Sequence, residues 1–88
     1  MIEKEVKIVN KAGMHTRPAS MLVKIASKYK SDFFIIKDGF RVNAKSIIGV
    51  MTLAAECGSK VILTFDGPDE MKASEEIIKF FENGFGEL

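Results

Sequence analysis

Hydrophobic and polar residues alternate at the start of the chain. Over residues 2–9, Val6 and Ile8 alternate with charged side chains, a period that predicts a half-buried strand. Residues 10–13 include a glycine and predict a loop. From residue 16 the apolar positions follow the spacing of an amphipathic helix, and they are Leu22, Ile25, Ala26 and Tyr29.

The ends of this helix follow from the residues found there. Thr16 is a candidate N-cap, and Pro18 suits a first turn, where the missing N–H has no intrahelical partner to lose. We expect the helix to begin at residue 16 or 17 and to end near Tyr29 or Lys30.

The remaining segments predict a hairpin, a short helix, a strand and a last helix. Residues 33–37 and 40–43 are rich in aromatic and β-branched side chains, and the Asp-Gly pair between them predicts a tight turn. The short helix is expected from Ser46, in capping position, to about Leu53, and the strand at residues 61–65. Asp69 can cap the last helix. The residues with helical spacing in this segment are Ser74, Ile77, Ile78, Phe81 and Phe85.

These elements give the order β-α-β-β-α-β-α. The hairpin makes the sheet at least partly antiparallel, and three helices on one face of a four-stranded sheet would bury their apolar sides. With 88 residues, the chain is expected to form a single domain, residues 1–88. We therefore predict a two-layer α+β fold.

Composition excludes several classes of protein. Hydrophobic residues make up 47% and charged residues 28%, as in ordinary soluble domains, and the net charge of +1 favours neither a nucleic acid nor a membrane as partner. The first residues lack the basic and apolar pattern of a signal peptide. Cys57 is the sole cysteine, so an intrachain disulfide is impossible; we interpret Cys57 as a buried filler and expect a reducing, cytoplasmic setting.

His15, the only histidine, lies between a glycine-containing loop and the predicted helix start. The unpaired N–H groups and dipole of a helix N-terminus form an anion site, and a neutral imidazole there can act as a nucleophile. A phosphoryl group on it would meet the N–H groups of Thr16 and Arg17 and the Arg17 guanidinium. A loop histidine without a role fits the same pattern, so both interpretations stay open. One histidine makes a poor metal site, and no metal is expected.

Ser46 and the helix that follows it are the second candidate region. A serine in this position is commonly only a cap, but a phosphate on it would add about −1.5 to −2 charges at a favourable helix end. If Val50 and Leu53 face inward, part of the run Ile47, Ile48 and Met51 is exposed, which would mark a protein contact. The alternative is that these side chains complete the core.

The two regions resemble the HPr family, the phosphocarriers of the bacterial phosphoenolpyruvate-dependent sugar phosphotransferase system. GMHTRPA at residues 13–19 is similar to the family's phosphorylation motif G-[LI]-H-A-R-P-A, with Met and Thr in place of the usual Leu or Ile and Ala. VNAKSIIGVM at residues 42–51 is similar to its second motif, and residues 67–70 resemble the turn before its final helix. The resemblance implies an open-faced β-sandwich of four antiparallel strands and three helices.

The resemblance also implies a role and partners. His15 would carry phosphate as pros-phosphohistidine, taken from phosphorylated Enzyme I and passed to sugar-specific Enzyme II A domains, with Arg17 stabilising the phosphate. Ser46 matches the site of the HPr kinase/phosphorylase, and a catabolite-control transcription factor would be a further partner. Docking would map onto Ser20, Met21, Lys24, Ile47, Ile48 and Met51. We expect a monomeric carrier rather than an enzyme, without a cofactor and without direct contact to nucleic acid or membrane.

Two other functions fit parts of the pattern. A regulatory binding module would signal through Ser46 and play little part in sugar transport, although the presence of His15 weighs against a purely regulatory protein. A small RNA-binding domain would need strand aromatics, such as Phe34 and Phe40, together with a basic face. The net charge of +1 and the lack of a basic cluster argue against RNA binding.

Overall fold

The computed structural model describes residues 1–87 as a four-stranded sheet with three α-helices. The elements are β1 (Ile2–Lys7), α1 (Thr16–Ala26), β2 (Asp32–Lys37), β3 (Phe40–Asn43), α2 (Ile47–Thr52), β4 (Lys60–Asp66), α3 (Glu70–Glu82) and a final 3-10 turn, η1 (Gly84–Gly86). The strands lie in the order β1-β4-β2-β3, and every neighbouring pair is antiparallel. The predicted α+β fold is therefore confirmed.

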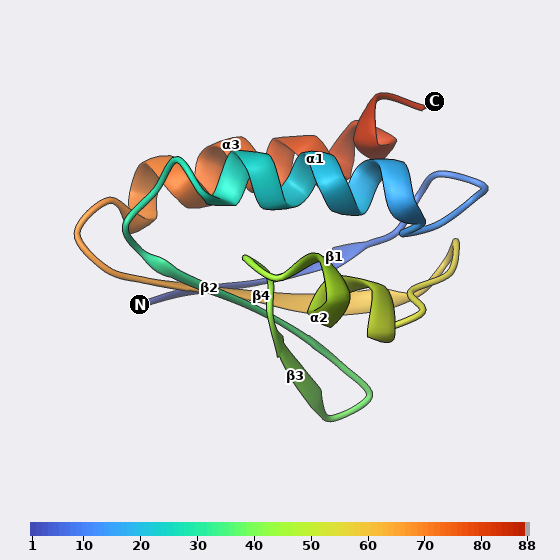
Figure 1. Cartoon of the computed structure of the whole chain (residues 1–88), viewed down its shortest axis with the longest axis horizontal. Helices are drawn as coiled ribbons and strands as arrows, with labels where there is room; N and C mark the ends of the chain where they lie inside the picture. Colours follow the sequence, from blue (N-terminus) through green and yellow to red (C-terminus); the bar gives the residue numbers. More distant parts are fainter. Residues whose placement is uncertain (88) are drawn as a thin grey trace.

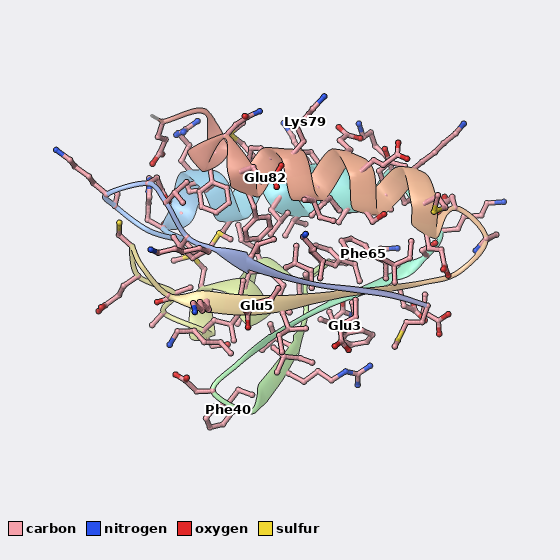
Figure 2. The ribbon with its side chains drawn as sticks, turned by 180° about the vertical axis from the view of Figure 1, so that it is seen from behind. Glu3, Glu5, Phe40, Phe65, Lys79 and Glu82 are labelled. Carbon is pink, nitrogen blue, oxygen red and sulfur yellow. The ribbon has the colours of Figure 1, made fainter. Side chains whose placement is uncertain are left out.

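The sheet and the helices form two layers. Figure 1 shows α1 and α3 running side by side along the sheet, and α1 packs against both α2 and α3. Figure 2 shows Phe65 between α3 and the sheet, with Lys79 on the outer side of α3. Phe65 stacks on Phe33 of the neighbouring strand with 4.7 Å between ring centroids. Burial of each such large side chain stabilises the fold by roughly 1.5–3 kcal/mol, which fixes the helices on this face.

The first helix begins at Thr16, within the predicted limit, but its N-cap and its C-terminal end differ from those expected. His15, rather than Thr16, is the N-cap, and Thr16 is the first helical residue. The helix ends at Ala26, before the expected Tyr29, because the N–H groups of Lys28 and Tyr29 bond to carbonyls three residues back and tighten the chain into a turn. The apolar period extended past the helix because Tyr29 still packs against the core.

The last helix also differs in its details. Asp69 is the N-cap of α3, but its carboxylate makes no capping bond; it accepts hydrogen bonds from the N–H groups of Lys30 and Ser31 and from the Ser31 hydroxyl. These bonds lower the pKa of Asp69 to about 2. Phe85, placed on the helical period, lies beyond α3 in η1 with a left-handed backbone (φ 58°). The side chain of Phe85 is still fully buried, which explains why its apolar character matched the helix pattern.

Candidate functional site

The loop before α1 presents His15 at the surface. Gly13 has a positive φ of 70°, and a Cβ at this position would lie 2.6 Å from the carbonyl oxygen of Ala55, so only glycine fits the close approach of the two segments. The next residue, Met14, is buried, and its N–H donates to the same carbonyl at 2.8 Å. Anchored in this way, the loop leaves the His15 side chain 41% exposed at the N-terminus of α1.

A carboxylate from the other end of the described chain meets His15. The Nε2 atom of His15 lies 2.8 Å from Oε2 of Glu87. Arg17 donates to the same oxygen from Nε at 3.0 Å and from Nη2 at 2.7 Å. The structure thus brings His15 and Arg17 together, as the sequence predicted, but around an acidic group that the sequence analysis did not identify.

Asn10 completes the set of groups around Glu87. Its buried side chain donates from Nδ2 to Oε1 of Glu87 at 2.7 Å and to the carbonyl of Gly13 at 2.8 Å. Bonds from Arg17 and Asn10, and then from His15, lower the pKa of Glu87 to about 2. Glu87 is therefore ionised throughout the physiological range and can only accept hydrogen bonds.

The turn after α3 determines where Glu87 lies. Gly84, Phe85 and Gly86 all have positive φ, and together they fold the chain back toward the start of α1. The Phe85 ring packs edge-on against the Phe81 ring, with 5.0 Å between centroids. The backbone carbonyl of Phe85 accepts a hydrogen bond from Nη2 of Arg17 at 3.2 Å. The two glycines were the only signal of this turn in the sequence, and no spacing connected it with His15.

Ser46 lies at the start of α2, as predicted. It is the N-cap, and its Oγ accepts from the N–H of Gly49 at 3.2 Å. The side chain is exposed. The hydroxyl thus serves as a cap and is also accessible from solvent.

An apolar patch covers the outer sides of α1 and α2, and we define it as Met21, Ile47, Ile48 and Met51. Ile48 is 73% exposed and the other members 36–38%, whereas Val50 and Leu53 point into the core. Of the two alternatives for this helix, the exposed one is correct. Ser20 and Lys24 are also exposed on α1. Nη1 of Arg17 lies 3.1 Å from the sulfur of Met21, so the patch adjoins the His15 site.

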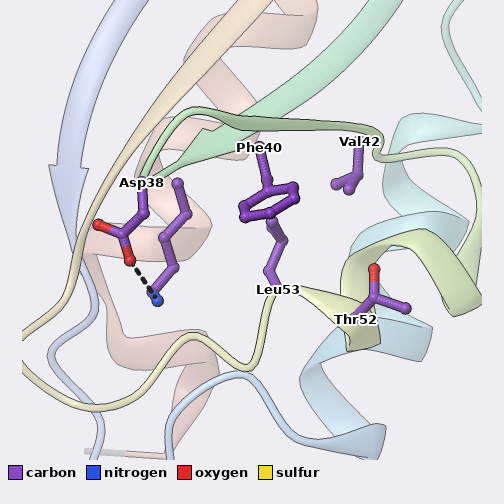
Figure 3. A pocket seen from close by; sticks show the side chains of 6 residues that line it. Asp38, Phe40, Val42, Thr52 and Leu53 are labelled. Atoms are coloured by element: carbon purple, nitrogen blue, oxygen red, sulfur yellow. Dashed lines mark hydrogen bonds and ion pairs between the residues drawn. The ribbon is translucent and has the colours of Figure 1, made fainter.

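Other features of the surface lie apart from this site. Cys57 is exposed rather than buried, because it belongs to the turn that leads to Gly58, where φ is 92°. A pocket of about 340 Å³ opens at the β2–β3 hairpin between Phe40 and Leu53, and His15 is not among its lining residues (Figure 3).

Within residues 1–87, no three His, Cys, Asp or Glu side chains form a group that could hold a metal ion. None of the helices in these residues is long and apolar enough to cross a membrane.

Comparison with known proteins extends over nearly the whole chain. Residues 2–83 match a family described as the PTS HPr component phosphorylation site. The chain is 47% identical over 87 residues to the phosphocarrier protein HPr of Treponema pallidum, covering 99% of both, and 46% identical over 82 residues to the HPr-like protein Crh of Halalkalibacterium halodurans, covering 93% of this chain and 98% of Crh. The crystal structure of HPr-C-His from Thermoanaerobacter tengcongensis superimposes with a TM-score of 0.96 at 42% identity, covering 100% of this chain and 99% of that one. The chain therefore belongs to the HPr family, the phosphocarriers of the phosphotransferase system.

Proposed function

We propose that His15 accepts a phosphoryl group from phosphorylated Enzyme I and passes it to the Enzyme II A domains of sugar uptake. The observation that carries this proposal is the position of His15: a half-exposed imidazole at the N-terminus of α1, with the Arg17 guanidinium bound to the same carboxylate oxygen. A nucleophile, an anion site and a counter-charge are present together, which is what transfer of a phosphoryl group requires.

The first turn of α1 supplies the anion site. The N–H of Ala19 already donates to the carbonyl of His15 at 3.0 Å, and Pro18 has no N–H. Among residues 1–87, the backbone donors that remain at this end are those of Thr16 and Arg17, where the helix dipole also favours a negative group. Phosphate oxygens next to His15 would accept from these two N–H groups.

Arg17 must change partners during the cycle. Its guanidinium donates to Glu87 through two nitrogens and to the carbonyl of Phe85. A phosphoryl group carries more negative charge than a carboxylate and forms stronger charge-assisted bonds with arginine. Arg17 would therefore release Glu87 and bind the phosphate oxygens once His15 is modified.

The exposure of His15 suits a carrier, which is a co-substrate of other enzymes rather than an enzyme itself. The phosphorylated side chain has to enter the active sites of its partners, and the apolar patch next to it offers a surface on which they could dock. Ser20, Met21, Lys24, Ile47, Ile48 and Met51 would form this contact. We further propose a monomer that functions in the cytoplasm as a single HPr domain.

A regulatory role for Ser46 is the second proposal. Its hydroxyl is exposed and caps the helix that carries most of the apolar patch. A phosphate placed there by an HPr kinase would keep a favourable position at the helix end and add charge beside Ile47 and Ile48. Docking of Enzyme I would weaken, and a catabolite-control transcription factor could recognise the modified surface.

Phosphoryl transfer from labelled phosphoenolpyruvate through catalytic Enzyme I tests the first proposal. We expect stoichiometric label on the wild-type protein and none on His15→Ala, with Ser46→Ala as a control that still accepts label. Undiminished labelling of His15→Ala would refute the assignment. For Ser46, ATP and an HPr kinase should yield phosphoserine in the wild type and none in Ser46→Ala, as read by mass spectrometry.

A further inference from the structure

The β2–β3 hairpin carries the one exposed aromatic side chain among residues 1–87. Phe40 is 74% exposed, whereas the other aromatic side chains in this part of the chain are buried or half-buried. The turn at Asp38 and Gly39, with φ of 51° and 83°, places Phe40 opposite Lys37 at the outer end of the edge strand β3. Exposure of so much apolar surface is unfavourable in water, and aromatic side chains are enriched in protein interfaces. Phe40 is therefore a candidate for contact with another protein.

Phe40 forms one wall of a pocket rather than part of a flat surface. Side chains alternate along β3, so Val42 lies on the same face of the strand as Phe40. This is the face toward the helices, because Val42 is paired with Ile35, which is buried in the core. The pocket of about 340 Å³ opens between the Phe40 ring and Leu53, with Val42 and Thr52 beside them (Figure 3).

The polar groups that line this pocket already have partners. Nζ of Lys37 lies 3.1 Å from the carboxylate of Asp38 at one end of the pocket (Figure 3). The hydroxyl of Thr52 donates to the carbonyl of Gly49 at 2.7 Å. The lining residues thus present no unpaired charge to an ionic ligand, and the other three are apolar. An apolar side chain is the group that fits such a pocket.

The pocket continues the apolar patch on α1 and α2. Ile48 and Thr52 are four residues apart on α2 and share one side of the helix. Thr52 lines the pocket, so a protein that covers Ile48 reaches the pocket one helical turn further on. Leu53 lies two residues before Ala55, whose carbonyl is bonded to the loop that presents His15. The pocket is therefore next to the patch and at the end of α2 that adjoins the His15 loop.

We propose that Enzyme I places an apolar side chain in this pocket, between Phe40 and Leu53, when it docks on the apolar patch. The proposal rests on the proposed function of His15 as the phosphoryl acceptor, and it extends the contact from α1 and α2 to the β2–β3 hairpin. Enzyme I has to recognise the chain while His15 carries no phosphate, so its binding depends on the surface around the histidine. A few side chains seated in pockets supply most of the binding energy of a protein interface.

Steady-state kinetics with Enzyme I test this contact. Phe40→Ala removes an exposed ring and leaves the core intact, so we expect the KM of Enzyme I for this variant to rise about fivefold or more with kcat unchanged. Thr52→Phe keeps Phe40 but fills the pocket from α2, and it should raise the KM as well. Met71→Ala, at a 65% exposed position on α3, is the control and should keep the wild-type KM. A wild-type KM for either pocket variant would overturn the proposal.

NMR of the methyl-labelled protein with unphosphorylated Enzyme I gives a readout that needs no transfer. We expect the methyl signals of Val42 and Leu53 to shift or broaden together with those of Ile48, and Phe40→Ala to reduce the changes at the pocket. Changes confined to the patch, with Val42 and Leu53 unaffected, would overturn the proposal. Binding of Enzyme I without any transfer of label would instead refute the proposed function of His15.

Discussion

At the scale of single residues, the site depends on a few polar groups whose partners are far apart in the sequence. Asn10 is buried and donates through one amide nitrogen to both Gly13 and Glu87, while its Oδ1 has no partner among the described residues. Because two acceptors face the nitrogen, the amide has one orientation that satisfies them. The motif at residues 13–19 predicted His15 and Arg17, but a lone asparagine and a distant glutamate carried no comparable signal.

Replacement of Asn10 by Ala should therefore lower stability and loosen the His15 loop. Truncation leaves the Gly13 carbonyl without its side-chain donor, a loss of about 1–3 kcal/mol in the free energy of unfolding. Chemical denaturation monitored by circular dichroism measures the loss. Asn10→Asp serves as a matched variant: it keeps the size but faces Glu87 with a second carboxylate, so it should be at least as unstable, and a stable Asn10→Asp would contradict the assigned contacts.

The ionisation of Glu87 gives a pH dependence with a defined sign. Its pKa falls from the usual 4.5 to about 2 in the folded protein, so its contribution to stability is fully present above pH 4.5 and is lost as the pH falls toward 2. The difference in unfolding temperature between the wild type and Glu87→Gln should shrink across this range. A constant difference from pH 6 to pH 2 would show that the carboxylate is not paired as described.

At the scale of elements, most of the fold could be predicted because apolar periodicity and turn residues are local signals. The Asp38-Gly39 turn has φ of 51° and 83° at its two residues, the left-handed conformation that this pair favours in hairpins. The C-terminal end of α1 and the turn η1 were missed for a physical reason. Tyr29 and Phe85 both pack against the core although they lie beyond the ends of α1 and α3. The apolar pattern therefore extends further along the chain than the helical hydrogen bonds do.

The short helix α2 depends on its cap. Its six residues make few internal hydrogen bonds, and Ser46 supplies the acceptor for the N–H of Gly49. Ser46→Ala should destabilise the protein by about 0.5–2 kcal/mol, whereas Ser46→Asp keeps a capping oxygen and should stay near the wild type. Thermal unfolding followed by calorimetry distinguishes them, and equal losses in both variants would argue against the cap.

At the scale of the whole molecule, the fold gathers the loop of His15, the start of α1 and the turn after α3 next to the patch on α1 and α2. The sequence could place the first two together because they are adjacent along the chain. It could not place Glu87, since that position depends on how α3 packs alongside α1 and on the left-handed turn that follows. The sequence could not decide whether Ile47, Ile48 and Met51 on α2 are exposed or buried. Their burial depends on which other elements cover the helix, and that is not a local property of the sequence.

The patch should contribute to binding of partners but not to folding. Ile48 is 73% exposed, so Ile48→Glu removes little buried surface while it places a charge in the proposed contact. We expect the KM of Enzyme I for this variant to rise by about tenfold or more, a change typical of a central interface residue. Met71→Glu, at a 65% exposed site on α3, is the control. If the two variants have the same KM, the patch is not the docking surface.

The central claim is that His15 carries the phosphoryl group, on Nδ1 as the resemblance to the family implies. The most direct measurement is heteronuclear NMR of the protein labelled in its imidazole nitrogens and phosphorylated by phosphoenolpyruvate and Enzyme I. We predict coupling between phosphorus and Nδ1 of His15, with the proton retained on Nε2 while the ring is cationic. Coupling to Nε2, or phosphate on any other residue, would contradict the account.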